Sequence, residues 1–233
     1  MDEYAVIVAG GSGSRMSSNL PKQFIEIGRL PILMRTINQF IKYSTSINIL
    51  LVLPENQIEF WLQLCIKHSF YPDRLSIVKG GNTRFQSCRN GINSILVPNA
   101  LVAIHDGVRP FISTEIIKKG FELSAQKATA VCCVVSKDST RYLDVERETN
   151  TALDRNRVRL VQTPQIFQLN ILKKAYSVAE NESFTDDASV VELAGFPINL
   201  FEGDYKNIKI TTQEDLALAE IFLTHSNQID FEK

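Results

Sequence analysis

The chain has 233 residues, of which 44% are hydrophobic and 22% are charged, a composition typical of a globular protein with a sizeable core. Its 25 Lys and Arg residues and 26 Asp and Glu residues give a net charge of −1, so the chain has no general positive field that would bind nucleic acid. These values exclude a disordered protein, a collagen-like protein and a protein that coats nucleic acid.

Short apolar runs alternate with longer amphipathic stretches over the first 135 residues. The runs lie at residues 4–9, 47–53, 75–78, 101–105 and 129–135, and the amphipathic stretches at residues 32–43, 55–69, 83–96 and 113–125. The runs are nearly continuous and β-branched or Leu-rich, as strands buried on both faces are. The alternation predicts a doubly wound, mainly parallel α/β sheet with helices on both faces, in which ligands bind at the carboxyl ends of the strands.

A glycine-rich segment follows the first predicted strand. It reads Ala9-Gly10-Gly11-Ser12-Gly13-Ser14-Arg15-Met16 and is followed by Pro21-Lys22. Closely spaced glycines let backbone N–H groups converge on an anion, and Arg15 and Lys22 add positive charge. The Gly-Lys-Ser/Thr ending of a Walker A loop is absent, and Met16 stands where a dinucleotide-binding loop has its third small residue. A tight turn alone would also use these glycines, but with the two cations they favour a triphosphate site.

A second glycine pair follows the third predicted strand, in Gly80-Gly81-Asn82-Thr83-Arg84-Phe85-Gln86-Ser87. Asn82 resembles the N-cap of the next helix. Exposed backbone groups and the Ser87 hydroxyl would line a pocket for a flat polar base. An ordinary capped loop explains the same residues equally well.

The fourth predicted strand runs into His105-Asp106-Gly107-Val108-Arg109-Pro110. A carboxylate at the carboxyl end of a buried strand suits a Mg²⁺ ion or a hydroxyl group beside a nucleotide. The alternative is that Asp106 forms an Asx turn and pairs with Arg109, but its position favours a functional role. We expect His105 to be a structural histidine rather than a catalytic base.

Residues 136–158 are mostly polar, with weak alternation on either side of a predicted turn at residues 148–150. Such a segment buries little by itself. It is either a floppy insertion or a two-stranded arm that packs on a second subunit. An isolated hairpin is marginal in water, which favours the arm.

The remainder of the chain predicts helices at 169–180, 185–194 and 212–223, and strands at 198–202 and 207–210. Polar groups recur here in Asp154-Arg155-Asn156 and in Gln162-Thr163-Pro164-Gln165. Thr185 precedes two acidic residues, as a helix N-cap does. Lys209 lies in a predicted apolar strand, where a buried cation needs a partner such as an anionic substrate.

Four cysteines are present, Cys65, Cys88, Cys132 and Cys133, and none forms a C-x-x-C pair. We expect small buried side chains rather than a disulfide framework or a zinc site. The N-terminal segment has neither the basic start nor the cleavage site of a signal peptide, and no apolar run approaches the roughly 20 residues of a membrane-spanning helix. We therefore expect a cytoplasmic protein.

Six motifs in one order resemble those of the 2-C-methyl-D-erythritol 4-phosphate cytidylyltransferase family, over residues 4 to about 223. They are A-G-G-S-G-S-R-M with P-K-Q, G-G-N-T-R-F-Q-S, H-D-G-V-R-P-F, D-R-N with Q-T-P-Q-I-F, T-D-D-A-S-V-V-E and N-I-K-I-T-T-Q-E-D-L-A-L-A-E. Ribitol-5-phosphate cytidylyltransferase shares the fold and the first three motifs. Asp154-Arg155 and the T-D-D-A-S-V-V-E motif favour the methylerythritol enzyme. The resemblance implies one nucleotidyltransferase domain, residues 1–233, with a β-arm at about 136–158.

The resemblance also implies the reaction, which joins CTP to 2-C-methyl-D-erythritol 4-phosphate and releases pyrophosphate. It assigns Arg15 and Lys22 to the α-phosphate in the transition state. It assigns CTP to the backbone of Ala9, Gly10 and Gly11, with Gly81, Asn82 and Ser87 near the cytosine. It places Asp106 and Gly107 between the two substrates, and gives the second substrate to Arg155, Thr163, Thr185 and Lys209.

By the same resemblance Mg²⁺ bridges the CTP phosphates, with Asp106 as a candidate ligand, and Arg155 reaches the site of a partner in a homodimer. Two positions depart from the family pattern. Asn82 stands where relatives often carry Asp, which makes a carboxylate role there doubtful, and Gly10 replaces a usual alanine. A non-catalytic nucleotide sensor is the rival hypothesis. It is disfavoured because Arg15, Lys22 and Lys209 are all retained.

Overall fold

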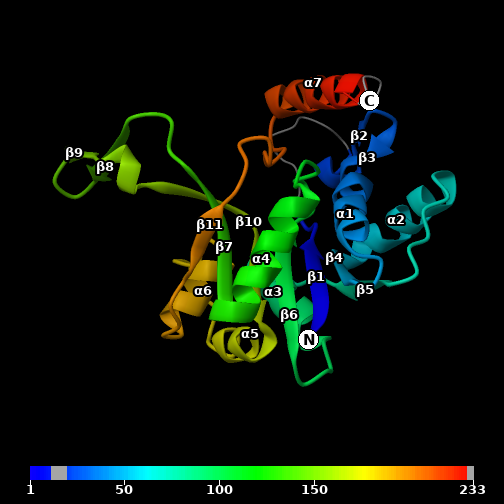
Figure 1. Ribbon diagram of the computed structural model, residues 1–233, viewed down its shortest axis with the longest axis horizontal. Coiled ribbons are helices and arrows are strands. Elements are labelled where there is room, and N and C mark those ends of the chain that lie inside the picture. The colour runs from blue at the N-terminus through cyan, green and yellow to red at the C-terminus, as the bar shows by residue number, and fades with distance from the viewer. Residues whose placement is uncertain (12–19, 230–233) are drawn as a thin grey trace.

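The structure, a computed structural model, describes residues 1–11 and 20–229. A seven-stranded sheet forms its centre, in the order β11-β7-β10-β6-β1-β4-β5 (Figure 1). The strands are β1 (Asp2–Val8), β4 (Asn48–Leu53), β5 (Leu75–Lys79), β6 (Ala100–Asp106), β7 (Thr129–Val135), β10 (Arg159–Gln168) and β11 (Leu200–Glu202). The five strands predicted in the first 135 residues all form close to their expected bounds. β1, β4, β6 and β7 are largely apolar and buried, as the sequence pattern indicated, but β5 lies at the edge of the sheet and none of its residues is fully buried.

The sheet is mainly parallel, which confirms the predicted fold class. The exception is β10, which runs antiparallel to both of its neighbours, β6 and β7. The apolar pattern of the sequence did not predict this strand. A small hairpin of β2 (Glu26–Ile27) and β3 (Leu30–Pro31) was not expected either.

Helices cover both faces of the sheet. One face packs against α1 (Ile32–Tyr43), α2 (Glu55–Lys67) and α4 (Thr114–Lys127), and the other against α3 (Arg84–Asn93), α5 (Leu169–Ala175) and α6 (Asp187–Leu193). The helices present their apolar side chains at helical spacing, as Leu33, Ile37 and Phe40 of α1 do. The last helix, α7 (Gln213–Ile229), joins a third and smaller core with Ile27 and Ile210.

Three predicted elements differ from the structure. The helix predicted at 169–180 ends at Ala175, and the helix predicted at 185–194 begins at Asp187, because Asp186 rather than Thr185 is its N-cap. Residues 207–210 are a loop and not a strand. The apolar residues that suggested a strand, Ile208 and Ile210, pack in the third core, and the Ile210 N–H donates to the Val108 carbonyl at 2.9 Å.

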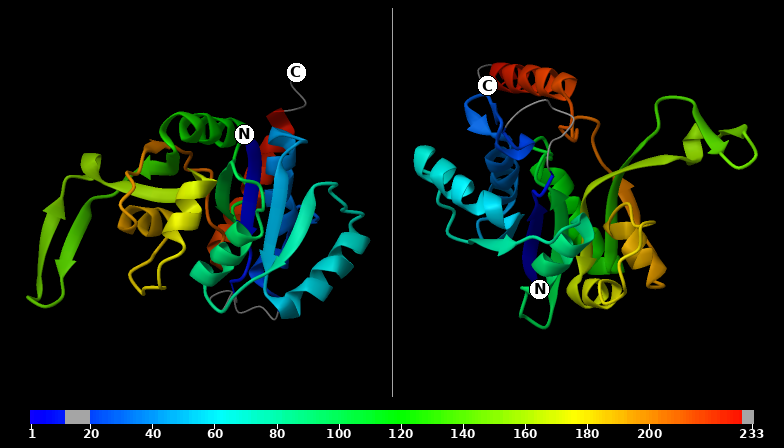
Figure 2. Two further views of the ribbon diagram at one scale, coloured as in Figure 1. Left: turned by 90° about the horizontal axis from the view of Figure 1, so that it is seen from below. Right: turned by 180° about the vertical axis from the view of Figure 1, so that it is seen from behind.

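A two-stranded arm stands clear of the rest of the chain in all three views (Figures 1 and 2). Its strands are β8 (Thr140–Asp144) and β9 (Thr149–Leu153), and the turn lies at residues 145–148 rather than at 148–150. Every residue of β9 is exposed. At the base of the arm, Lys137 Nζ lies 3.6 Å from the centre of the Tyr205 ring, and the Tyr205 hydroxyl donates to the Val135 carbonyl at 2.8 Å.

The four cysteines are free and buried, as expected. Within residues 1–11 and 20–229, no helix combines the length and the apolar character needed to cross a bilayer.

Candidate active site

Two neighbouring cavities open near the carboxyl ends of β1 and β6. The first, of about 230 Å³, is lined by the end of β1, by the loop before α3 and by the short 3-10 helix η2 (Lys22–Phe24). The second, of about 260 Å³, is lined by β10 and by the start of α6. Arg84, Asp106 and Lys209 line both cavities, so the two spaces meet at one group of charged side chains.

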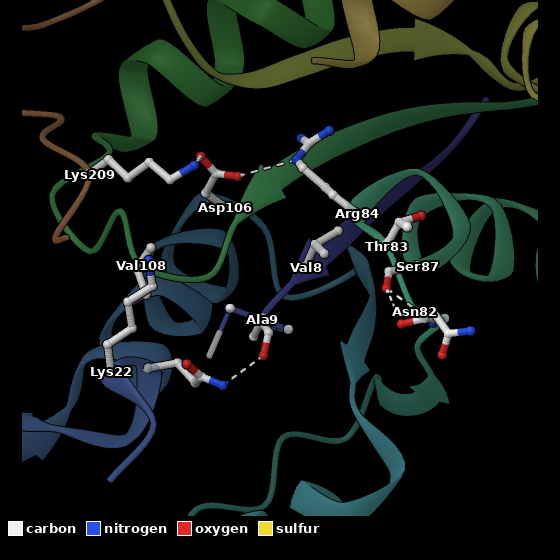
Figure 3. A pocket seen from close by; sticks show the side chains of 14 residues that line it. Val8, Ala9, Lys22, Asn82, Thr83, Arg84, Ser87, Asp106, Val108 and Lys209 are labelled. Atoms are coloured by element: carbon white, nitrogen blue, oxygen red, sulfur yellow. Dashed lines mark hydrogen bonds and ion pairs between the residues drawn. The ribbon is translucent and has the colours of Figure 1, made fainter. Parts of the chain in front are cut away.

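Asp106 is the centre of this charged group. Its Oδ2 lies 3.0 Å from Lys209 Nζ and 3.2 Å from Arg109 Nε, and its Oδ1 lies 3.8 Å from Arg84 Nε. Figure 3 shows Lys209 and Arg84 reaching the carboxylate from opposite sides. Burial alone would raise the pKa of the Asp106 carboxyl, but the Arg84, Lys209 and Arg109 charges outweigh it and hold that pKa well below its usual range. Asp106 is therefore a fixed carboxylate at neutral pH.

The loop before α3 has a rigid backbone. The Gly81 N–H donates to Ser87 Oγ at 3.1 Å, and the Asn82 N–H donates to Gln86 Oε1 at 3.0 Å. A Cβ on Gly81 would lie only 2.3 Å from the Gln86 Cβ, so this position requires glycine. The expectation that Asn82 caps α3 is wrong, because Thr83 is the cap and its hydroxyl accepts from the Gln86 N–H.

The loop after β1 brings Ala9, Gly10 and Gly11 to the first cavity. In Figure 3, Ala9 is seen between Lys22 and Asn82. Lys22 lines the same cavity from η2, and a Cβ on Gly11 would lie 3.1 Å from Lys22 Cε. The sequence thus predicted that the glycines of this loop and Lys22 lie close together. Arg15, the other predicted cation of the loop, lies outside the described residues.

Thr163 and Gly107 shape the surroundings of Asp106. Thr163 Oγ1 accepts the Asp106 N–H at 3.0 Å and lies 3.1 Å from His105 Nδ1. Gly107 lines neither cavity, and its N–H donates to the Val8 carbonyl at 2.9 Å. A Cβ there would lie 2.9 Å from the Ala9 Cβ, so glycine allows this loop to pack against the end of β1.

The other predicted residues divide into two groups. Thr185 lines the second cavity and is exposed, and Lys209 lies at the junction of the cavities with 42% of its side chain exposed. Lys209 is therefore not the buried strand cation that the sequence suggested. Arg155 lines neither cavity, and in its own chain its Nη1 donates to the Lys137 carbonyl at 3.2 Å near the base of the arm.

Arg84 is the main site residue that the sequence analysis overlooked. It is the first residue of α3 and lines both cavities. A cation at a helix N-terminus is disfavoured by the helix dipole, so an arginine at this position was itself a signal of a specific role.

His105 is structural, as expected. Its Nε2 donates to the Arg109 carbonyl at 3.3 Å, which leaves Nδ1 to accept from the Thr163 hydroxyl. Burial lowers the pKa of His105 to about 4, so the imidazole is neutral at pH 7.

This histidine predicts a pH dependence of stability. As the pH is lowered below 6.5, His105 takes up a proton in the unfolded chain, whereas in the folded chain it takes up a proton only near pH 4. The free energy of unfolding should therefore fall by up to roughly 3 kcal/mol as the pH is lowered from 6.5 to 4. Urea unfolding of His105→Gln, which stays neutral, should show a shallower fall than the native protein. His68→Gln is the matched control, since His68 lies beside Glu26 and away from both cavities. Equal slopes for native protein and His105→Gln would contradict the prediction.

The chain matches known proteins over nearly its whole length. The family model for 2-C-methyl-D-erythritol 4-phosphate cytidylyltransferase matches residues 4–225. The enzyme of that name from Bacteroides thetaiotaomicron is 45% identical over 96% of this chain and 100% of its own, and the one from Clostridium perfringens is 41% identical over 94% and 97%.

Solved structures agree. The crystal structure of 4-diphosphocytidyl-2C-methyl-D-erythritol synthase from Anaerococcus prevotii superimposes with a TM-score of 0.82 at 28% identity, covering 96% of this chain and 98% of that one. That of 2-C-methyl-D-erythritol 4-phosphate cytidylyltransferase from Thermus thermophilus gives a TM-score of 0.74 at 27% identity, covering 95% and 98%. With the family model, the curated relatives and the solved folds in agreement over nearly the whole length, the chain belongs to the 2-C-methyl-D-erythritol 4-phosphate cytidylyltransferase family.

Proposed function

We propose that the chain transfers the cytidylyl group of CTP to 2-C-methyl-D-erythritol 4-phosphate and releases pyrophosphate, a step in non-mevalonate isoprenoid precursor synthesis. The observation that carries the proposal is the pair of cavities that meet at Arg84, Asp106 and Lys209. Two substrates bound in them would be neighbours, as a direct transfer requires. The whole chain would act as one nucleotidyltransferase domain, with residues 136–158 as its arm.

The proposed chemistry is a single displacement at phosphorus. A phosphate oxygen of the polyol phosphate attacks the α-phosphorus of CTP, a new P–O bond forms, and the bond to the β-phosphate oxygen breaks as pyrophosphate leaves. The nucleophile is already an anion and needs no strong base. The neutral, buried His105 fits this requirement. The work left to the protein is alignment and the neutralisation of crowded oxyanions.

In this scheme CTP occupies the first cavity. The backbone of Gly81 and Asn82 and the Ser87 side chain face the cytosine, and the backbone of Ala9, Gly10 and Gly11 faces the phosphates. The loop before α3 supports this arrangement, because hydrogen bonds from its backbone to Ser87 and Gln86 hold it to α3 beside the first cavity. Lys22 and Arg15 would act on the α-phosphate in the transition state.

The polyol phosphate occupies the second cavity. Lys209 and Thr185 would hold it. Both the hydroxyl proton of Thr163 and one of its lone pairs are already engaged, so Thr163 would accept a hydrogen bond from a substrate hydroxyl rather than donate one. Asp106, with Gly107 behind it, would accept from hydroxyl groups between the two substrates.

A Mg²⁺ ion bound with CTP would supply positive charge against the phosphate oxygens of the nucleotide. Asp106 is poorly suited to be its ligand, because its two oxygens face three cations. Among residues 1–11 and 20–229, no group of three His, Cys, Asp or Glu side chains could hold a metal ion. Magnesium usually keeps several waters and binds substrate phosphates, which agrees with this arrangement.

We also propose a homodimer in which the arm carries Arg155 to the partner's second cavity. Two observations support it. Arg155 lines neither cavity in its own chain, and β9 has no buried residue. A two-stranded hairpin without a core needs another surface for stability.

A substrate panel tests the proposed reaction. Pyrophosphate release is expected only when CTP and 2-C-methyl-D-erythritol 4-phosphate are both present. Equal or faster turnover with ribitol 5-phosphate would favour the related enzyme, although the family model and the relatives above do not. CTP binding without pyrophosphate release for any polyol phosphate would instead indicate a nucleotide sensor.

A further inference from the structure

A buried polar cluster lies behind the junction of the two cavities. Asp187 is completely buried, and its two oxygens accept from Arg84 Nη1 at 3.0 Å and Nη2 at 2.6 Å. The hydroxyl of Tyr176, itself 3% exposed, donates to Asp187 Oδ1 at 2.5 Å. Tyr176 is held in turn by a stacked contact with Phe85, at 4.8 Å between ring centres.

The cluster fixes the direction of the Arg84 side chain. Both terminal nitrogens of its guanidinium engage Asp187, so the Nε edge is the one that faces Asp106, at 3.8 Å. A two-pronged pair of this kind restrains an arginine in position and in plane, which a single contact would not do. The position of the Arg84 guanidinium relative to the Asp106 carboxylate is therefore restrained.

The same pair connects the segments that form the two cavities. Arg84 begins α3, directly after the loop that carries Gly81 and Asn82. Asp187 is the first residue of α6 and lies two positions after Thr185, with the N-cap Asp186 between them. The Arg84–Asp187 contact thus holds the nucleotide loop to the start of α6. Arg84 lines both cavities, whereas Asp187 lines neither of them.

We propose that Arg84 and Asp187 are positioning residues for the transfer reaction, with Tyr176 as their support. Resting on the proposed function, the inference is that this ion pair, with its carboxylate fully buried, sets how the polyol phosphate and the α-phosphorus face each other. Small errors of placement cost such reactions about 10²-fold in rate.

A double substitution separates this role from a purely structural one. Removing one partner would leave the other charge unpaired, whereas replacing both by apolar side chains leaves no charge at the buried Asp187 position, so Arg84→Met with Asp187→Leu is designed to fold. We expect kcat/KM for the polyol phosphate to fall about 10²-fold, mostly through kcat, while the dissociation constant of CTP changes much less. A folded double variant within about threefold of native kcat/KM would overturn the proposal.

A milder variant keeps the test decisive if the double variant does not fold. Tyr176→Phe removes one hydrogen bond to Asp187 and keeps the ring, so a loss of about threefold to tenfold in kcat/KM is expected at unchanged helix content. Tyr43→Phe is the matched control. Tyr43 also donates to a carboxylate, Glu3 at 3.1 Å, and also stacks on a phenylalanine, Phe121 at 5.5 Å, but it lines neither cavity.

Equal activity of Tyr176→Phe and Tyr43→Phe would contradict the positioning role. The native enzyme separates the two proposals. Native protein that releases no pyrophosphate from CTP and the polyol phosphate would refute the proposed reaction, and the positioning role with it. Active native protein with unaffected variants would refute the positioning role alone.

Discussion

Lys22→Ala is expected to lower kcat about 10³-fold while CTP still binds within about tenfold of its native affinity. Lys22 lines the nucleotide cavity beside Gly11, so its charge stands where the triphosphate is proposed to lie. The α-phosphate gains a fifth oxygen neighbour only in the transition state, and a fixed cation beside it acts most strongly at that moment. The measurement is single-turnover pyrophosphate release together with CTP titration by calorimetry.

Lys67→Ala is the matched control for this substitution. Lys67 is an exposed lysine that pairs with Glu26 at 2.6 Å and lines neither cavity, so its loss should leave turnover unchanged. A fall in CTP affinity as large as the fall in kcat would mean that Lys22 only binds the nucleotide.

Arg155→Ala is expected to lower kcat/KM for the polyol phosphate about 10²- to 10³-fold in a homodimer, because the arginine would bring a bidentate phosphate contact to the second cavity. Mixing this variant with Lys22→Ala should restore activity. One site of each mixed dimer would then combine an intact Lys22 with an intact Arg155 from the partner, and random exchange restores about a quarter of native activity.

The mixing experiment has its own control. Arg141→Ala removes another arginine of the arm, one whose Nε bonds Asn150 within the hairpin, and should keep turnover near the native value. If Arg155 serves its own chain, each mixed dimer holds two defective sites, and mixing gives no recovery.

The apolar runs predicted the parallel part of the sheet because most of their side chains are buried, with the edge strand β5 as the exception. β10 was not predicted for a physical reason. Its first three residues are exposed, and its middle holds Gln162, Thr163 and Gln165, which are buried and hydrogen-bonded to Asp204, Asp106 and Asp186. These polar residues shorten the apolar run of β10 to its end, at Ile166 and Phe167.

The candidate site was predicted unevenly. Residues next to a strand end, such as Gly11 and Asp106, were predicted because topology alone brings the carboxyl ends of strands together. Lys22, in η2, was predicted from its charge beside the glycine-rich segment. Arg84 and Asp187 are 103 positions apart in the chain, and no local sequence pattern predicts a contact over such a separation. Lys209 was identified for the wrong reason, since its apolar neighbour Ile210 belongs to the small core under α7 rather than to a strand.

The exposed hairpin of β8 and β9 affects how the effects of substitutions on stability should be interpreted. Its side chains add almost nothing to the interior of their own chain, so a mutational scan scored by thermal stability would rank residues 140–153 as tolerant. In the proposed homodimer, the partner surface that the hairpin contacts would constrain the sequence of these residues. Substitutions in the hairpin and on that partner surface would then be expected to occur together in evolution, while the rest of the fold changes little.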